Sequence, residues 1–413
     1  MYSRKLLFVA LTLVTTTSFA AEMSSLRFAF GTNAPAAGWT RVAPEKFYGG
    51  TNQFGFEPGA QLAVSGSGVS SLQPFLFSVA VTEGNYRVSV ELGAADEATT
   101  NTVKAESRRL MLERVVTAPG TFERQTFTVN VRTPELADGR RVKLKPRELG
   151  PPLVLHWDDK LTLEFNGARS GLASVEIIPV TNAITVFLVG DSTVTDQPNE
   201  PWNSWGQMLP RFFQPGVAVA NHAESGETLK NSFNARRIEK VLSAMHPGDY
   251  LFVQFGHNDM KDRATNALAN YKSNLIRLVA ETRARGGTPV LVTSMERKTG
   301  VTNDTFGAYP DTVRAVAAGQ GVVLIDLHAM SKRLYAAMGA DLDKAFQDGT
   351  HHNAYGSYEL ARCVVQGVRE SKLPLADHLS PDVPAFDPNQ PDPVSNFDVP
   401  ASPTSSGEKP DGS

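Results

Sequence analysis

The sequence contains a single cysteine, Cys363, among its 413 residues. One thiol excludes an intramolecular disulfide framework and any cysteine cluster for zinc or iron–sulfur. An excess of one charge is also missing, since 40 lysines and arginines stand against 43 aspartates and glutamates. Because the chain has no large positive net charge, nucleic acid and anionic membrane surfaces are not expected as partners. The length suffices for two or three domains of about 100–200 residues each.

The apolar run at residues 6–14 is shorter than the roughly 20 residues that a membrane span requires. It follows Arg4 and Lys5 and precedes the small-residue pattern at 18–20. These features predict a secretory signal over residues 1–20. We therefore expect a protein exported to the periplasm or the medium, with no membrane span once the signal is removed.

Residues 374–413 are rich in proline and aspartate and contain only two aromatic residues, Phe386 and Phe397. Such a composition offers little apolar surface to offset the entropy lost when a chain becomes ordered. The sequence predicts a disordered tail or linker here, and it does not indicate a role for that tail.

Residues 22–181 alternate apolar and polar side chains over short stretches such as 86–92, 127–131 and 161–165. Glycine, proline, asparagine and aspartate separate these stretches. Alternation with a period of two predicts strands that bury one face, and many such strands indicate a β-sandwich. Within this region no serine, histidine and aspartate have a spacing that suggests catalysis.

Residues 183–373 have a different pattern, in which near-continuous apolar runs alternate with helical periodicity. The runs lie at 184–189, 217–220, 250–255, 290–292 and 322–325. Runs of this kind are typical of parallel strands covered on both faces. Apolar residues over 268–279 recur at helical spacing before Gly286 and Gly287, and Cys363 lies in a predicted last helix as a buried thiol. We predict an α/β fold, a doubly wound parallel sheet of flavodoxin-like type.

Polar residues follow several of these predicted strands, where the carboxyl ends of parallel strands meet at one edge of the sheet. A serine nucleophile needs a base, a carboxylate that orients the base, and donors for the oxyanion. The sequence predicts Ser192 as nucleophile, His351 as base and Asp348 as the orienting carboxylate. The backbone N–H groups of Ser192 and Gly226 and the side-chain amide of Asn258 would form the oxyanion hole.

These four blocks resemble the SGNH (GDSL-like) hydrolase superfamily, whose blocks centre on Ser, Gly, Asn and His in this order. The motifs at 190–193, 205–207 and 256–259 look closest to those of rhamnogalacturonan acetylesterases and bacterial pectin acetylesterases. The resemblance covers nearly all of residues 183–370. It implies a serine esterase that forms an acetyl-enzyme intermediate and needs no metal and no organic cofactor. Two features depart from the pattern or lack an explanation: Thr228 replaces a common serine, and His352 adds a second imidazole.

The N-terminal region also resembles a known module, through Phe28–Gly31, Tyr48–Gly49 and Phe54–Glu57. These motifs look like the galactose-binding-like or carbohydrate-binding-module-like sandwich that precedes some bacterial pectin-degrading esterases. Both glycan binding and a packing or spacer role remain open for this domain.

The resemblance implies an acetylated plant cell-wall polysaccharide as substrate, with rhamnogalacturonan or another pectin first. Trp202, Arg236 and Arg297 are the candidate substrate contacts, through sugar stacking or galacturonate carboxylates, although packing and a solvated surface are the simpler roles. Acetylated xylan and short-chain lipid esters are alternative substrates for the same machinery. A non-catalytic carbohydrate-binding protein is the alternative from another class, and the oligomeric state is open.

Overall fold

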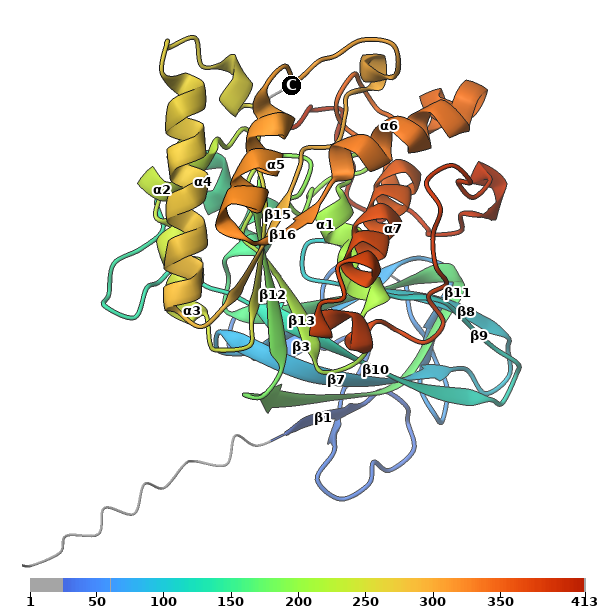
Figure 1. The fold of residues 1–413 in the computed structure, drawn as a ribbon. Coiled ribbons are helices and arrows are strands. Elements are labelled where there is room, and N and C mark those ends of the chain that lie inside the picture. The colour runs from blue at the N-terminus through green and yellow to red at the C-terminus, as the bar shows by residue number, and fades with distance from the viewer. Residues whose placement is uncertain (1–24, 60, 412–413) are drawn as a thin grey trace, which may run out of the picture.

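The protein is described here by a computed structural model that covers residues 25–59 and 61–411. The predicted signal, residues 1–20, lies outside the described residues. A β-rich half precedes an α/β half, and the two pack against each other along a broad interface (Figure 1). Within the described ranges no helix combines the length and the hydropathy of a bilayer-spanning segment.

The β-rich half consists of two sheets joined by one long strand. That strand, β11, pairs through its first part with β6 and β8 and through its second part with β1, β5 and β7. One apolar core lies between the sheets and includes Phe77, Val90 and Leu163, all fully buried. This is the predicted β-sandwich. Its strands are β1 (Leu26–Ala29), β2 (Thr40–Arg41), β3 (Phe54–Phe56), β4 (Ala63–Val64), β5 (Val69–Ser71), β6 (Phe75–Ala80), β7 (Gly84–Gly93), β8 (Thr99–Ala105), β9 (Arg109–Thr117), β10 (Phe122–Val131) and β11 (Lys160–Val180).

The α/β half is built on a parallel sheet with strand order β13-β12-β14-β15-β16. The strands are β12 (Ile184–Gly190), β13 (Val217–Asn221), β14 (Tyr250–Gln254), β15 (Thr288–Val292) and β16 (Val323–Ile325). The helices are α1 (Trp205–Met208), α2 (Leu229–Asn234), α3 (Arg237–Ala244), α4 (Ala267–Ala284), α5 (Tyr309–Gln320), α6 (Leu327–Met338) and α7 (Ala354–Glu370). Short 3-10 helices occupy η1 (Pro146–Leu149), η2 (Leu153–His156), η3 (Leu209–Phe212), η4 (Asp259–Lys261), η5 (Lys298–Val301), η6 (Gly339–Ala345), η7 (Pro374–His378) and η8 (Val394–Asn396).

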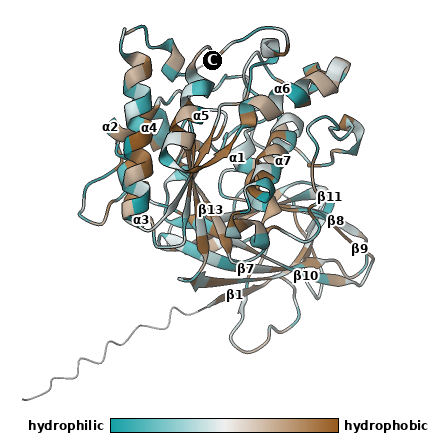
Figure 2. Ribbon diagram, viewed as in Figure 1, coloured by the Kyte–Doolittle hydropathy of each residue, from teal (hydrophilic) through white to brown (hydrophobic). Residues whose placement is uncertain are grey.

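Helices cover both faces of this sheet, which is why its strands are apolar throughout. Along β12, Val186 and Leu188 pack into the core shared with α1, α6 and α7, whereas Phe187 and Val189 pack into the core shared with α3, α4 and α5. Hydrophobic residues accordingly concentrate in the central strands and on the inner sides of the helices (Figure 2). The predicted doubly wound α/β fold is confirmed.

The two halves are joined by the tip of the hairpin between β8 and β9. Leu110 belongs to the apolar core of the α/β half although it lies in the sandwich sequence. Beside it, the buried guanidinium of Arg109 forms an ion pair with Asp196, Nε to Oδ2, at 3.1 Å. Arg109 also donates hydrogen bonds to the carbonyls of Asn130 and Val219, each at 3.0 Å. A cation from one half thus neutralises a buried carboxylate of the other.

The prediction of a disordered tail over 374–413 is wrong for the residues that the structure describes. Residues 374–411 run along both halves, and Phe386 is buried in the α/β core while Phe397 packs against the rings of Tyr355 and Tyr358. Lys104 of the sandwich donates to Pro400 O and Ser402 Oγ, each at 2.7 Å. Composition was misleading because the few leucine, valine and phenylalanine residues of the segment all find partners in the α/β core, buried charged side chains bind its backbone, and its prolines reduce the entropy lost on ordering.

Replacing Arg109 with methionine should lower the free energy of unfolding by about 3–5 kcal/mol, because the buried Asp196 would lose the cation in direct contact with it. Urea denaturation followed by circular dichroism measures this loss. Arg114→Met is the matched control, because Arg114 lies on the same β9 strand with a side chain that is 63% exposed. The control should change stability by no more than about 0.5 kcal/mol. Equal losses in the two variants would contradict the role assigned to Arg109.

Candidate active site

A hydrogen-bonded relay of three side chains lies at the carboxyl edge of the parallel sheet. Ser192 Oγ is 2.8 Å from His351 Nε2, and His351 Nδ1 is 2.9 Å from Asp348 Oδ2. The other carboxylate oxygen, Asp348 Oδ1, accepts hydrogen bonds from the backbone amides of Thr350 and His351, each at 2.7 Å. Burial tends to raise the pKa of Asp348, but these hydrogen bonds outweigh it and hold the pKa well below its usual range. An ionised Asp348 fixes the proton on Nδ1 and leaves Nε2 to accept the serine proton.

Ser192 reaches this edge because it follows the end of β12, where Asp191 shapes the turn. The fully buried Asp191 carboxylate accepts hydrogen bonds from the amide and hydroxyl of Thr193, at 3.0 and 2.7 Å. Its other oxygen lies 3.3 Å from His257 Nδ1. Burial raises the pKa of Asp191, but His257 and Thr193 together lower it below its usual value. Asp191 therefore holds the turn that carries Ser192.

The loops that carry the predicted oxyanion donors contact one another. Asn258 Nδ2 donates to Glu227 O at 3.1 Å, which ties Asn258 to the loop of Gly226. Gln197 Nε2 donates to Ser192 O at 2.6 Å and lies 3.3 Å from Ser225 Oγ, which ties that loop to the nucleophile. Gly226 has φ +74°, a backbone conformation that a residue with a Cβ rarely adopts. The three predicted donor positions thus belong to one connected group of loops.

The comparisons with known proteins agree with this fold. The model of the GDSL-like lipase/acylhydrolase family matches residues 188–357. The rhamnogalacturonan acetylesterase RhgT of Bacillus subtilis is 37% identical over 218 residues, which are 48% of this chain and 94% of that protein. This chain belongs to the GDSL-like lipase/acylhydrolase family. It is a carboxylic ester hydrolase.

Two further relatives differ in how much of this hydrolase they match. A probable rhamnogalacturonan acetylesterase of B. subtilis, YesY, is 31% identical over 211 residues, or 47% of this chain and 96% of that protein. The uncharacterised esterase YxiM of the same organism is 27% identical over 381 residues, or 86% of this chain and 93% of that protein. The similarity to YxiM therefore includes much of the β-sandwich as well.

His352 and Thr228, the two residues left unexplained by the family pattern, have structural roles in this hydrolase. His352 Nε2 is 2.9 Å from the hydroxyl of Tyr335, and the imidazole packs against the rings of Tyr335 and Phe346. Burial lowers the pKa of His352 to about 3. Thr228 caps α2, since its hydroxyl accepts the amide of Asn231 at 3.0 Å.

The candidate substrate contacts have different environments. Trp202 is buried, and its ring lies perpendicular to the His351 imidazole, with the ring centroids 5.9 Å apart. Arg297 lies near the site but uses its side chain within the protein, donating to His257 O and Thr350 Oγ1, each at 3.3 Å. Arg297 thereby links the loops that carry Asn258 and His351.

The structure does not support Arg236 as a substrate contact. Its guanidinium donates to Arg141 O at 3.3 Å and lies 3.8 Å from Glu239, in contacts at the start of α3. The adjacent Arg237 is buried instead and donates to Glu148 Oε2 at 2.5 Å. A pair of adjacent arginines carries no signal of which one faces inward.

Sequence reasoning also missed two cations that the sandwich half contributes to the rim of the site. Lys145 Nζ donates to Ser225 O at 2.5 Å and lies 3.1 Å from Glu227. Arg147 Nη2 donates to Glu224 and, at 3.1 Å, to Ser225 O. Both therefore hold the loop of Gly226 from the opposite half. Their distance in sequence from every catalytic block left no pattern that could have identified them.

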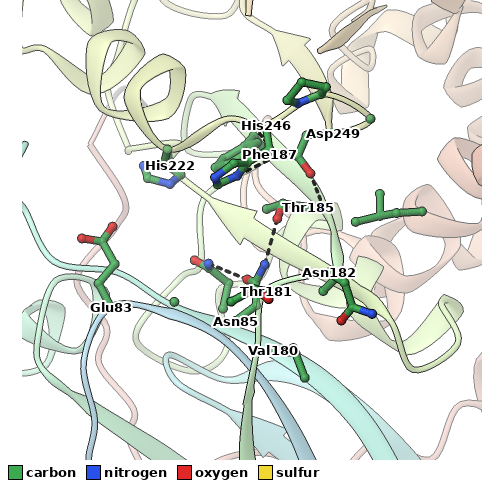
Figure 3. Close-up of a pocket in the computed structure, with 17 residues that line it drawn as sticks. Glu83, Asn85, Val180, Thr181, Asn182, Thr185, Phe187, His222, His246 and Asp249 are labelled. Atoms are coloured by element: carbon green, nitrogen blue, oxygen red, sulfur yellow. Dashed lines mark hydrogen bonds and ion pairs between the residues drawn. The ribbon is translucent and has the colours of Figure 1, made fainter. Parts of the chain in front are cut away.

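A separate cavity of about 420 Å³ lies between the halves at the amino-terminal start of β12 (Figure 3). Asn85 donates to Thr185 Oγ1 at 2.9 Å, and the Thr185 amide donates to Asp249 Oδ1 at 2.7 Å. These bonds join the sandwich to the parallel sheet at the start of β12, whereas Ser192 follows the other end of that strand. This cavity is thus distinct from the relay.

The stability of the hydrolase should decrease in mild acid partly because His352 stays neutral when folded. Its pKa is about 3 in the folded chain and about 6.5 when unfolded, so only the unfolded chain binds a proton between these values. The contribution of His352 is complete well above pH 6.5 and is lost as the pH falls, with a slope that approaches about 1.4 kcal/mol per pH unit below about pH 5.5. Between pH 6.5 and 5.5 the unfolded imidazole goes from half to mostly protonated, so urea denaturation should show about 1 kcal/mol less pH dependence in His352→Gln than in the wild type.

His246→Gln serves as the control for this measurement, because its side chain is 82% exposed. The control should keep the full pH dependence of the wild type. If His352→Gln also kept it, the buried neutral state of His352 would be contradicted.

Proposed function

We propose that this protein is an exported serine esterase that removes O-acetyl groups from pectin, with rhamnogalacturonan as its substrate. The observation that carries the proposal is the relay from Asp348 through His351 to Ser192, placed at the sheet edge beside Gly226 and Asn258. Relatives named rhamnogalacturonan acetylesterase, one of them 37% identical, support the choice of substrate. Export rests on the sequence of residues 1–20 alone.

In the proposed reaction, Ser192 Oγ attacks the acetyl carbonyl while His351 Nε2 accepts the hydroxyl proton. The Ser192 and Gly226 amides and the Asn258 side chain stabilise the oxyanion. His351 then donates the proton to the departing sugar hydroxyl, which leaves an acetylated Ser192. A water deprotonated by His351 attacks the acetyl-enzyme, releases acetate and restores Ser192. Asp348 keeps His351 in the tautomer that both steps need.

Ser192→Ala should lower the rate of acetate release by roughly 10⁴-fold or more without unfolding the protein, because the variant has no nucleophile. Acetate is measured with acetylated rhamnogalacturonan, acetylated xylan and nitrophenyl acetate as parallel substrates. Ser395→Ala removes an exposed hydroxyl on η8 and should keep the wild-type rate. A folded Ser192→Ala protein with wild-type turnover would contradict the mechanism. If the wild-type enzyme released acetate faster from acetylated xylan than from acetylated rhamnogalacturonan, the proposed substrate would be wrong.

Asn258→Ala should lower kcat by about 10²–10³-fold and change KM little, because the amide acts on the oxyanion and not on the bound ester. Steady-state kinetics with nitrophenyl acetate measures both constants. If Asn258→Ala raised KM and left kcat unchanged, Asn258 would instead bind the ester in the ground state, and its role in the oxyanion hole would be contradicted.

A further inference from the structure

The nucleophile and the base are covered in this structure. Ser192 and His351 are each 1% exposed, although an ester must reach both of them. A cavity of about 360 Å³, within the size range of ligand sites, lies beside them. Its lining includes Trp202, whose ring contacts His351, and Arg147, together with residues 408–411 of the C-terminal segment. The chain itself thus occupies the space next to the relay.

Asp411 makes the contacts that define this occupation. Its carboxylate lies 3.1 Å from Arg147 Nε, and its Cβ would be 3.0 Å from a Cβ built on Gly226. Lys145 Nζ would lie 3.6 Å from the same position. A carboxylate carried by this chain therefore rests on a guanidinium directly over the predicted oxyanion loop.

We propose that Arg147, with Lys145 beside it, forms a subsite for the carboxylate of a uronic acid residue of the substrate, and that Asp411 occupies it in the unliganded protein. This inference rests on the proposed function and specifies how that site recognises an acidic sugar chain. The subsite comes from the sandwich half, so it also gives that half a role in substrate binding.

The chemistry of the cavity fits such a ligand. A guanidinium offers planar, paired donors that match a carboxylate. Arg147 directs Nη2 to Glu224 and Ser225 O and Nε to Asp411, so Nε is the donor that a substrate carboxylate would take over. Trp202 presents an indole whose Nε1 has no hydrogen-bond partner among the described residues. The chain as a whole has a net charge of −3, so an anionic polymer must be recognised by local cations.

The C-terminal segment is attached more firmly up to Ser406 than beyond it. The Glu200 amide donates to Thr404 O at 2.9 Å, and the Glu200 carbonyl accepts the Ser406 amide at 3.1 Å. Residues 407–409 are exposed, Pro410 is buried, and Asp411 is held by a half-exposed ion pair. An ion pair with this exposure is weak, so a substrate carboxylate can displace Asp411, with Pro410 moving beside it, while the part up to Ser406 stays in place.

Inhibition of nitrophenyl acetate hydrolysis by trigalacturonate tests the subsite, with neutral galactotriose as the reference sugar. Asp411→Asn should lower the inhibition constant of trigalacturonate by roughly 5-fold, because the resident carboxylate no longer competes. Arg147→Gln should raise that constant by about 10-fold or more. Galactotriose should show neither change. The assay needs only an active esterase, so acetate release from acetylated rhamnogalacturonan, measured separately, tests the proposed function independently.

Two variants of matched charge are the controls, Asp398→Asn for the segment and Arg141→Gln for the sandwich loop. Both side chains are more than 60% exposed, and neither lines the cavity that contains Arg147 and Asp411. Both controls should keep the wild-type inhibition constant and the wild-type basal rate. Should Arg147→Gln fail to fold after losing its pair with Glu224, Asp411→Asn decides alone. An unchanged inhibition constant in Asp411→Asn would overturn the proposal.

Discussion

The arrangement of both halves depends on a positive charge buried between them. Without Arg109, the buried Asp196 carboxylate would lose the cation that contacts it, and the loss of a buried ion-pair partner costs far more than the loss of an exposed one. Burial raises the pKa of Asp196 and so opposes its ionised form, while Arg109 and Arg132 favour it. The sandwich and the parallel sheet are therefore coupled by electrostatics as well as by apolar packing.

This coupling extends directly to the nucleophile. Arg108, at the same hairpin tip, donates to Gln197 O and Trp202 O, each at 2.9 Å, and Gln197 in turn donates to Ser192 O. The loop after the nucleophile is thus positioned from the other half. Part of the support for the catalytic loop in this protein therefore comes from the sandwich half.

Residues close together in sequence or in repeating patterns were predictable, and contacts between distant segments were not. The strands follow from local hydrophobic patterns, and the relay follows because parallel topology brings loop residues such as Ser192 and His351 to one edge. Arg147 lies 77 residues from its partner Glu224 and belongs to a loop without periodicity. The order in 374–411 depends on hydrogen-bond partners in both halves, such as Lys104, which composition does not reveal.

The path of the last described segment limits how this enzyme can move. Its Ser402 is bound by Lys104 and Glu164 of the sandwich, while Asp392 is bound by Arg362 on α7 of the other half. A segment fastened at both places acts as a strap that opposes hinge opening between the halves. Access to the buried relay must then arise by local displacement of a few surface residues, because the two halves stay fixed to each other.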